Sequence, residues 1–533
     1  MTHTPWAVAA AATTLLLFVK SAATYSPYPT ATINAGIVVG TTTSVSPGAT
    51  VVNQFLGVRF AAPPRRFTPA QRSQPWLQPL KTDQRGPACI QQFSYPEDYR
   101  NLSIMLLNTP APEESEDCLF LNVFAPATPA TGKGRAVLFW IYGGGLWLGH
   151  AGHPFYDGSY FAANEDVIVV SANYRTNVFG FPNSPELPLQ DRNIGFLDQR
   201  FALDWVQRNI HAFGGDPSKV TLFGESAGAF SIDALLTSYP KGTSPPFRAA
   251  ILESGQLSYR GNPSPGKPYP DGRPAWDALA AALNCTTQQS NVTCIAAAPA
   301  ATIKDIIERG ALSFTPTVDN KTYLSDLAHA RTSGDIVRIP ILIGTTANEG
   351  RLIAIGQNNV TAYLQNTLGP GPNPNLVAKI AAAYPAGSTE FPTAYDAIAQ
   401  METDVSFRCG AALVANDTAA IGIPSWRFMF NATFPNTQRI PTGRAYHTTE
   451  LEIVFSTFPR ENATAEEFAL SDYMRGTWAR FAKNPEAGPG WGAIGEVDRD
   501  VAVFQNGNEH MKLIDQSELD ERCAVWREVL VGR

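Results

Sequence analysis

Ser226 is the residue best placed for covalent chemistry, because of the residues around it. It lies in the segment Val220–Gly228, a short apolar run that ends in Gly-x-Ser-x-Gly. The run predicts a strand, and the small residues at 229–236 predict a helix. A sharp turn between the two holds the serine hydroxyl at the carboxyl end of a sheet, beside a helix N-terminus. This position suits a nucleophile whose attack develops negative charge.

A serine nucleophile needs a base to take its proton and a carboxylate to orient that base. Where the serine sits on such a turn, the order along the chain is serine, acid, histidine. Of the 7 histidines, only His447 and His510 follow Ser226 with room for an acid before them. His447 lies in a loop shortly after a predicted strand over residues 425–430, whereas His510 lies in a polar tip typical of a solvated side chain. His447 is therefore the predicted base.

Glu349 is the predicted orienting acid. It comes directly after an apolar run over residues 339–344, which predicts a buried strand. Asp319 and Asp326 precede that strand and would lie at its wrong end. Glu225 is adjacent to Ser226, so we expect its side chain to point elsewhere and not to orient His447.

A run of three glycines provides a candidate site for an oxyanion. The continuous apolar segment 136–142 predicts a central strand buried on both faces, and it leads directly into Gly143–Gly145. Glycines here let the backbone approach a ligand closely and direct N–H groups at an oxygen. The alternative is a flexible turn without a function.

Strands alternate with helices over much of the chain. Further buried strands are predicted over residues 167–172 and 248–252, and a helix over 198–213, which ends at a Gly-Gly-Asp-Pro stop. The segment 55–64 is interpreted as a loop bounded by prolines. This alternation predicts an α/β fold with a central, mostly parallel sheet flanked by helices and large insertions, and a site beyond the carboxyl ends of the strands. The length of 533 residues favours a single large domain over two.

The composition is that of an ordinary globular protein, with 44% hydrophobic and 16% charged residues. The net charge of -7 and the absence of basic runs argue against nucleic acid or an anionic membrane surface as a partner. An apolar run over residues 6–19 precedes small residues near Ala23, which predicts a signal peptide over residues 1–23 and a domain over 24–533. A membrane anchor is the alternative, but the run is short for a span, so we expect no stable anchor.

Cysteines and glycosylation motifs agree with secretion. The 6 cysteines lack the close spacing of zinc or redox sites, so disulfides are favoured. Acceptor motifs for N-glycosylation occur at Asn101, Asn284, Asn291, Asn320, Asn359, Asn416, Asn431 and Asn462. Together with the leader they predict an extracellular glycoprotein.

The segment between Cys89 and Cys118 has no clear periodicity but is rich in aromatic and apolar residues, including Tyr99 and the group at 104–107. It can form a flap over a pocket, or it can pack flat on the surface as a loop. The residues of this segment are compatible with a flap and with a surface loop.

With these residues placed, the chain resembles the carboxylesterase/lipase (type-B) family of α/β-hydrolases, which includes secreted fungal esterases and lipases as well as cholinesterases. The resemblance covers nearly all of the chain after the leader. Its motifs lie at residues 55–64, 115–123, 143–145, 173–175, 193–199, 213–217 and 223–228.

The resemblance implies a catalytic triad, an oxyanion hole built from backbone N–H groups, and no metal or cofactor. The triad would be Ser226, Glu349 and His447, and the hole would use Gly144, Gly145 and Ala227. It also implies the disulfides Cys89–Cys118, Cys285–Cys294 and Cys409–Cys523, and structural ion pairs between Arg66 and Glu116 and between Arg175 and Asp198.

Two positions depart from the family pattern. Tyr142 replaces the histidine that usually precedes the glycines, with little expected loss because the hole uses backbone donors. The Cys89–Cys118 segment lacks the tryptophan that stacks on choline in cholinesterases, so choline esters are not expected.

The expected function is that of a secreted serine carboxylic ester hydrolase that works through an acyl-enzyme on Ser226. Its substrate would be a small-molecule or lipid ester. One alternative is a lipase activated at an interface, with the Cys89–Cys118 segment as its lid. Another is a non-catalytic adhesion or binding protein on the same fold. Nothing in the sequence predicts the oligomeric state.

Overall fold

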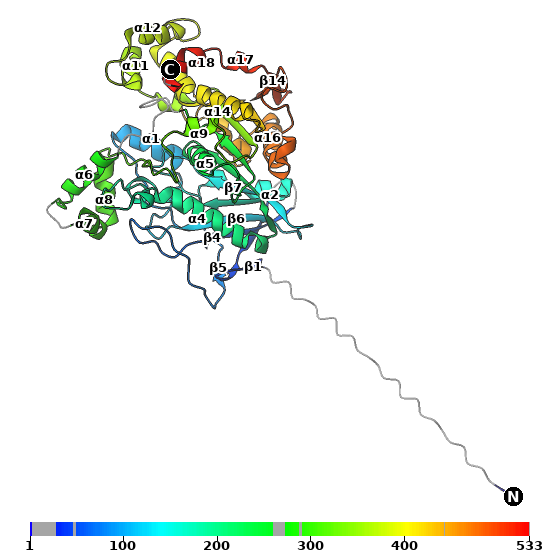
Figure 1. Ribbon diagram of the computed structural model, residues 1–533. Helices are drawn as coiled ribbons and strands as arrows, with labels where there is room; N and C mark the ends of the chain where they lie inside the picture. The colour runs from blue at the N-terminus through cyan, green and yellow to red at the C-terminus, as the bar shows by residue number, and fades with distance from the viewer. Residues whose placement is uncertain (3–27, 46–49, 260–271, 287–289, 442, 532–533) are drawn as a thin grey trace.

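An 11-stranded sheet forms the centre of the molecule, with the strand order β14-β13-β12-β11-β10-β9-β7-β8-β6-β4-β3. The structure is a computed structural model, and it describes residues 1–2, 28–45, 50–259, 272–286, 290–441 and 443–531 (Figure 1). The predicted signal peptide lies almost wholly outside the described residues.

The middle of this sheet is parallel. Each strand pairs in parallel with its neighbours from β8 through β7, β9, β10, β11 and β12 to β13. These strands are β7 (Arg135–Ile141), β8 (Ile168–Ala172), β9 (Gly215–Glu225), β10 (Ala249–Glu253), β11 (Ile341–Thr346), β12 (Ser425–Asn431) and β13 (Val501–Gln505). The continuous apolar runs predicted such strands because a parallel sheet is covered on both faces. The prediction of a mostly parallel sheet is confirmed.

The edges of the sheet are antiparallel. They consist of β3 (Thr41–Ser44), β4 (Val51–Arg59) and β6 (Phe120–Pro126) at one side and β14 (Met511–Ile514) at the other. The prediction of a loop from residue 55 was wrong, because β4 continues to Arg59. Its pairing with β6 is irregular between Phe55 and Val58, where Gly57 has a φ of +69°.

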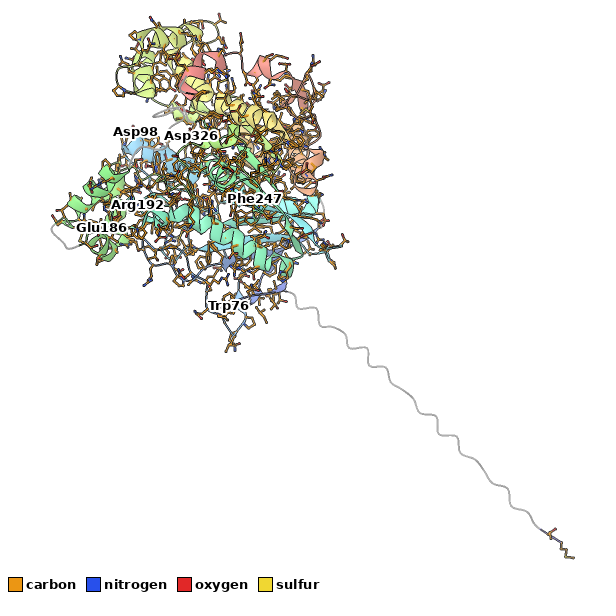
Figure 2. All side chains as sticks on the ribbon, viewed as in Figure 1. Trp76, Asp98, Glu186, Arg192, Phe247 and Asp326 are labelled. Carbon is orange, nitrogen blue, oxygen red and sulfur yellow. A yellow bond between two sulfur atoms is a disulfide. The ribbon has the colours of Figure 1, made fainter. Side chains whose placement is uncertain are left out.

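A separate 3-stranded sheet lies at one end of the molecule and contains β1 (Thr30–Ile33), β2 (Gly36–Val39) and β5 (Leu80–Lys81). Trp76 contacts this small sheet and donates its indole N–H to the Ile37 carbonyl of β2 at 3.0 Å (Figure 2).

Helices cover the central sheet. α4 (Ile194–Asn209) and α5 (Ala227–Ser238) contact β9, while α2 (Ser159–Glu165) packs on β6 and α16 (Ala465–Lys483) on β7. The predicted helix over 198–213 corresponds to α4 and a following 3-10 turn, Ile210–Phe213. None of the helices in the described part of the chain is long and apolar enough to cross a membrane.

A smaller apolar cluster joins helices near the C-terminus, at the top of Figure 1. It lies between α11 (Val360–Leu368), α12 (Pro374–Ala383), α13 (Ala394–Thr403) and α18 (Cys523–Val531). Trp526 is fully buried here, and its indole N–H donates to the Tyr384 hydroxyl at 2.7 Å.

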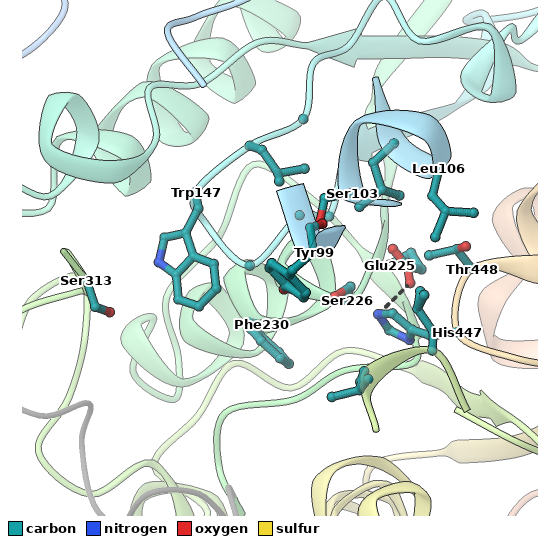
Figure 3. Close-up of a pocket in the computed structure, with 18 of the residues that line it drawn as sticks. Tyr99, Ser103, Leu106, Trp147, Glu225, Ser226, Phe230, Ser313, His447 and Thr448 are labelled. Carbon is teal, nitrogen blue, oxygen red and sulfur yellow. Dashed lines mark hydrogen bonds and ion pairs between the residues drawn. The ribbon is translucent and has the colours of Figure 1, made fainter. Parts of the chain in front are cut away.

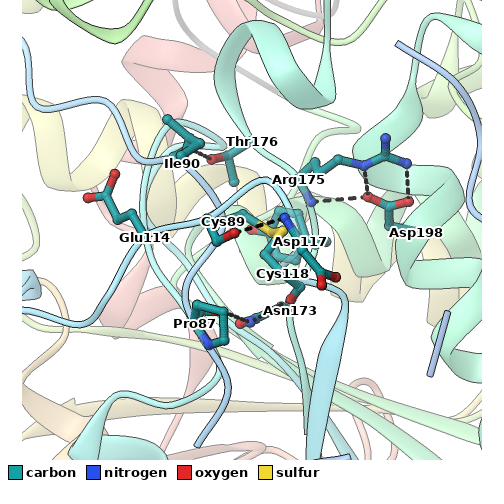
Figure 4. The surroundings of a disulfide bond; sticks show 12 residues. Pro87, Cys89, Ile90, Glu114, Asp117, Cys118, Asn173, Arg175, Thr176 and Asp198 are labelled. Atoms are coloured by element: carbon teal, nitrogen blue, oxygen red, sulfur yellow. Dashed lines mark hydrogen bonds and ion pairs between the residues drawn. A yellow bond between two sulfur atoms is a disulfide. The ribbon is translucent and has the colours of Figure 1, made fainter. Parts of the chain in front are cut away.

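All six cysteines form the disulfides that the resemblance implied, Cys89–Cys118, Cys285–Cys294 and Cys409–Cys523. Figure 4 shows the first of these beside the buried pair of Arg175 and Asp198, whose Nε and Oδ2 atoms lie 2.7 Å apart. The second implied ion pair also forms, with Arg66 Nε 2.8 Å from Glu116 Oε2. The first pair joins the segment after β8 to α4, and the second joins two segments outside the strands.

Candidate active site

Ser226 lies on the sharp turn between β9 and α5, with φ 52° and ψ -120°. Few residues other than glycine adopt this backbone region, and such strain is concentrated at functional sites. The turn is held by the Ser226 N–H, which donates to the Glu253 carbonyl at 2.9 Å. A Cβ atom on Gly228 would lie 1.9 Å from the Ile141 carbonyl oxygen, which explains the glycine after the serine.

Glu349 and His447 meet as predicted. Glu349 follows β11 and is fully buried, and its Oε2 lies 2.7 Å from His447 Nδ1. Its other oxygen accepts the Thr346 N–H at 2.7 Å, which fixes the carboxylate. With its Nδ1–H donated to Glu349, a neutral His447 presents the lone pair of Nε2, as a general base requires.

A π-helical turn supports the imidazole. The turn covers Asp404–Arg408, and it places the Phe407 ring 4.9 Å from the His447 ring. Arg408 anchors the turn by donating to the Ala347 carbonyl at 2.9 Å, two residues before Glu349. Sequence reasoning missed Phe407, because no local motif marks a π-helical turn.

The prediction that Glu225 points away from His447 was wrong. Glu225 Oε1 lies 3.2 Å from His447 Nε2, on the opposite edge of the ring from Glu349. The side chain reaches this position across Gly143, where a Cβ atom would lie 2.5 Å from Glu225 Oε2. The first glycine of the run therefore makes room for a carboxyl group beside the base.

The surroundings of Glu225 favour its neutral form. Burial, followed by the charges of Glu450, Glu349 and Glu253, raises the pKa of Glu225 well above its ordinary value. Although Glu225 Oε1 lies 3.2 Å from His447 Nε2, it makes no hydrogen bond to a described residue. Among the described residues, Ser226 Oγ makes no hydrogen bond to this nitrogen; such bonds often tighten only when substrate binds.

The three candidate oxyanion donors surround the serine. Gly144 and Gly145 have φ values of +100° and +66°, which favour glycine, and both line the cavity. Ala227 is the first residue of α5, so its N–H lacks an acceptor within the helix. Tyr142 donates its hydroxyl to the Tyr174 carbonyl at 2.8 Å.

A cavity of about 800 Å³ opens over Ser226, within the range of small-molecule sites. One wall is α1 (Glu97–Leu107), which contributes Tyr99, Leu102 and Leu106 (Figure 3). The Cys89–Cys118 segment is therefore a flank of the pocket and not a loop packed flat on the surface. Its helical period was hidden because the run over residues 104–107 is apolar at every position. Leu102, Leu106 and Leu107 line the cavity and also pack with Ile440 and Tyr446.

The other predicted residues lie outside the cavity. His510 lies in the turn between β13 and β14. Of the eight glycosylation motifs, two have half-buried asparagines (Asn291 and Asn416), and the rest are exposed: Asn101, Asn284, Asn320, Asn359, Asn431 and Asn462. Within the described ranges, no cluster of three or more His, Cys, Asp or Glu side chains could hold a metal ion.

Known proteins resemble this chain over most of its length. It is 33% identical to a para-nitrobenzyl esterase of Bacillus subtilis over 85% of this chain and 91% of that protein. It is 34% identical to secreted lipase 1 of Botryotinia fuckeliana over 61% of this chain and 62% of that protein. A solved structure of a PNB esterase superposes with a TM-score of 0.73 at 30% identity, covering 93% of this chain and 99% of the other.

The sequence profile of the carboxylesterase family matches residues 27–526. This match, the esterase relatives and the shared fold identify the chain as a carboxylic ester hydrolase with an α/β-hydrolase fold. It belongs to the carboxylesterase family.

Proposed function

We propose that the protein is a secreted serine esterase that forms an acyl-enzyme on Ser226. The observation that carries this proposal is the pairing of His447 Nδ1 with Glu349 Oε2 at 2.7 Å, in the same cavity as a serine on a strained strand–helix turn. These are the groups that a serine nucleophile requires.

In the first step, His447 takes the proton of Ser226 as Oγ attacks the ester carbonyl carbon. The imidazolium then gives this proton to the leaving alkoxide, which departs as the alcohol. In the second step, the same base activates water, which cleaves the acyl-enzyme and restores Ser226. Glu349 holds the imidazole in the required tautomer and stabilises its charged form.

The N–H groups of Gly144, Gly145 and Ala227 would stabilise the oxyanion of each tetrahedral intermediate. Each donor contributes on the order of 3 kcal/mol at the transition state. Because all three are backbone groups, the Tyr142 side chain does not need to take part.

Secretion has independent support. The three disulfides are typical of oxidising compartments, and no glycosylation motif has a buried asparagine. The mature chain would begin after Ala23, which N-terminal sequencing of the secreted protein tests.

Replacement of the nucleophile tests the mechanism. Ser226→Ala should abolish labelling by an organophosphate and lower ester turnover by about 10³-fold or more, because only binding and the oxyanion hole remain. Ser333→Ala, at an exposed serine beyond the cavity, is the matched control and should be labelled fully. Labelling or substantial turnover in Ser226→Ala would overturn the assignment, and an unlabelled wild type would favour a non-catalytic protein.

A lipase acting at a lipid surface is a second candidate, favoured by the exposed apolar residues around the cavity. Tyr99, Trp147 and Ile353 line it and are 54%, 37% and 43% exposed. Met105 of α1 and Ile355 are exposed nearby in the chain. Exposed apolar groups around a pocket mouth are typical of contact with a lipid surface.

A further inference from the structure

Two buried histidines that the proposed mechanism does not use line the same cavity as Ser226. His150 and His153 follow the glycine run and are only 4% and 3% exposed. Nε2 of each has no hydrogen-bond partner among the described residues. Buried polar atoms are rarely left without a partner in a folded protein, so a pair of them beside a cavity points to a ligand.

The proton on His153 can be placed. Its Nδ1 accepts the Phe155 N–H at 3.2 Å. Burial, followed by the charges of His150, Arg439 and Arg85, lowers the pKa of His153 to about 3, so the ring is neutral. Its single proton is therefore on Nε2, which makes this atom a donor that lacks an acceptor.

Tyr156 and Glu225 relate these histidines to the part of the cavity where the alcohol would leave. The leaving oxygen takes its proton from His447 Nε2, and Glu225 Oε1 lies 3.2 Å from that nitrogen. Tyr156 also lines the cavity, and it lies close enough to Glu225 that ionisation of Glu225 would raise the pKa of Tyr156 beyond the effect of burial. The centroids of the His153 and Tyr156 rings are 5.5 Å apart, so Tyr156 lies between the histidines and Glu225 in this series of neighbours.

The other side of the cavity differs in character. Figure 3 shows Trp147 and Ser313 on one side of Ser226, and Glu225 and His447 on the other. Apolar side chains such as Trp147, Phe230 and Leu312 line the cavity and suit an acyl group. The end of a bound ester near Trp147 would thus meet an apolar wall, while the other end would meet polar groups together with Leu106.

We propose that His150, His153, Tyr156 and Glu225 form a subsite for the leaving alcohol, and that this subsite selects esters whose alcohol carries free hydroxyl groups, such as glycerol monoesters. The proposal rests on the proposed function. A hydroxyl can accept the His153 Nε2 proton and donate its own to Tyr156 or Glu225. An ammonium group has no lone pair for His153, and an alkyl group leaves the buried donors unpaired.

Two esters of one acid test this selectivity, glycerol 1-butanoate and propyl butanoate, which differ only by two hydroxyl groups. With both esters in solution, wild-type kcat/KM should favour the glycerol ester by at least about tenfold, the effect of one hydrogen bond. His153→Leu should reduce this ratio by about tenfold, while His153→Gln, which retains a donor, should preserve most of it. His211→Leu, at an exposed histidine outside the cavity, should retain the wild-type ratio.

Organophosphate titration of Ser226 distinguishes a failure of the subsite proposal from a failure of the proposed function. A wild type that is labelled and hydrolyses propyl butanoate, but without preference between the esters, overturns the subsite and leaves the proposed function intact. An unchanged ratio in His153→Leu overturns it as well. A wild type that is neither labelled nor active overturns the proposed function itself. If His153→Leu does not fold, Tyr156→Phe, which removes one hydroxyl, should lower the ratio, and an unchanged ratio there also overturns the subsite.

Discussion

Two glutamates contact opposite edges of one imidazole. Glu349 holds Nδ1 at 2.7 Å and Glu225 lies 3.2 Å from Nε2. Only Glu349 is positioned to select the tautomer that serves as a base. Glu225 occupies the edge that must face Ser226 and the leaving oxygen during the reaction, and its raised pKa disfavours a competing negative charge at that edge.

The same substitution at both positions should therefore have unequal effects. Glu349→Gln should lower kcat by about 10³- to 10⁴-fold, because the amide cannot stabilise the imidazolium or enforce the tautomer. Glu225→Gln should lower kcat by less than about tenfold, because it replaces one neutral group by another of equal size. Steady-state kinetics at neutral pH on one soluble ester measure both. Equal losses would mean that Glu225 works as a carboxylate in the reaction.

The residues of the triad could be predicted because their order along the chain and their places after strands are local features. Ser226, Glu349 and His447 each follow a strand that an apolar run predicts. The contacts of Glu225 and Phe407 depend on side-chain paths and on a π-helical turn, for which the sequence carries no period. The contacts of both residues depend on tertiary packing, which a local sequence pattern does not encode.

Helix α1 forms one wall of the cavity over Ser226 and therefore shapes the space that a substrate can occupy. It contributes Tyr99, Leu102 and Leu106 to the cavity, and its segment is closed covalently by Cys89–Cys118. Its exposed residue Met105 adds to the apolar surface around the mouth. A lipid surface would cover this apolar area and stabilise an open pocket.

Met105→Ser should reduce hydrolysis of emulsified p-nitrophenyl palmitate several-fold, because burial of a methionine at the lipid surface contributes about 1.5 kcal/mol or more. Hydrolysis of dissolved p-nitrophenyl acetate should not change. Leu189→Ser is the matched control, since Leu189 is 44% exposed against 46% for Met105 but lies on no helix that lines the cavity. Equal effects of the two variants, or a wild type that prefers short dissolved esters and is not activated by an emulsion, would count against the lipase candidate.

At the level of elements, the sequence predicted best where burial is uniform. Strands β7, β8 and β10 to β12 are buried along nearly all of their length and were located within two residues of their starts. Strand β9 begins five residues before its predicted start, in a segment that includes Asp216 and Lys219. Strand β4 was interpreted as a loop because Pro63 and Pro64 follow it closely. Helix α1 escaped prediction because residues 104–107 are all apolar, including the exposed Met105, which obscures the spacing of Tyr99, Leu102 and Leu106 on one face.

Several carboxyl groups near the active site are buried in the core of the molecule. Glu225, Glu253 and Glu450 are buried, and burial raises the pKa of each. For Glu253 the pKa rises from 4.5 to about 8. The folded state therefore holds this proton more tightly than the unfolded state, and its contribution to stability is complete below pH 4.5 and is lost as the pH rises to about 8.

The free energy of unfolding should fall between pH 6.5 and about 8, by up to about 1.4 kcal/mol per pH unit for each such carboxyl. His150 and His153 do not obscure this range, because their lowered pKa values act on stability below pH 6.5. Glu253→Gln should flatten the dependence while retaining an acceptor for the Trp478 indole, now 2.6 Å from Oε1.

Denaturant unfolding at a series of pH values, with the disulfides intact, measures the slope of the free energy of unfolding against pH. Glu509→Gln, at an exposed carboxylate, should leave the slope unchanged. A slope in Glu253→Gln as steep as that of the wild type would show that Glu253 does not titrate in this range.

The exposed motif at Asn101 lies on α1, next to Leu102 of the cavity wall. A glycan attached there would stand at the entrance and place sugar hydroxyls among the apolar side chains that would contact a lipid surface. The expression host would then set the substrate range, since a bacterial product and a secreted fungal product would differ in size and polarity at the mouth. If Asn101 is glycosylated, preferences for ester chain length are comparable only between preparations that carry the same sugar there.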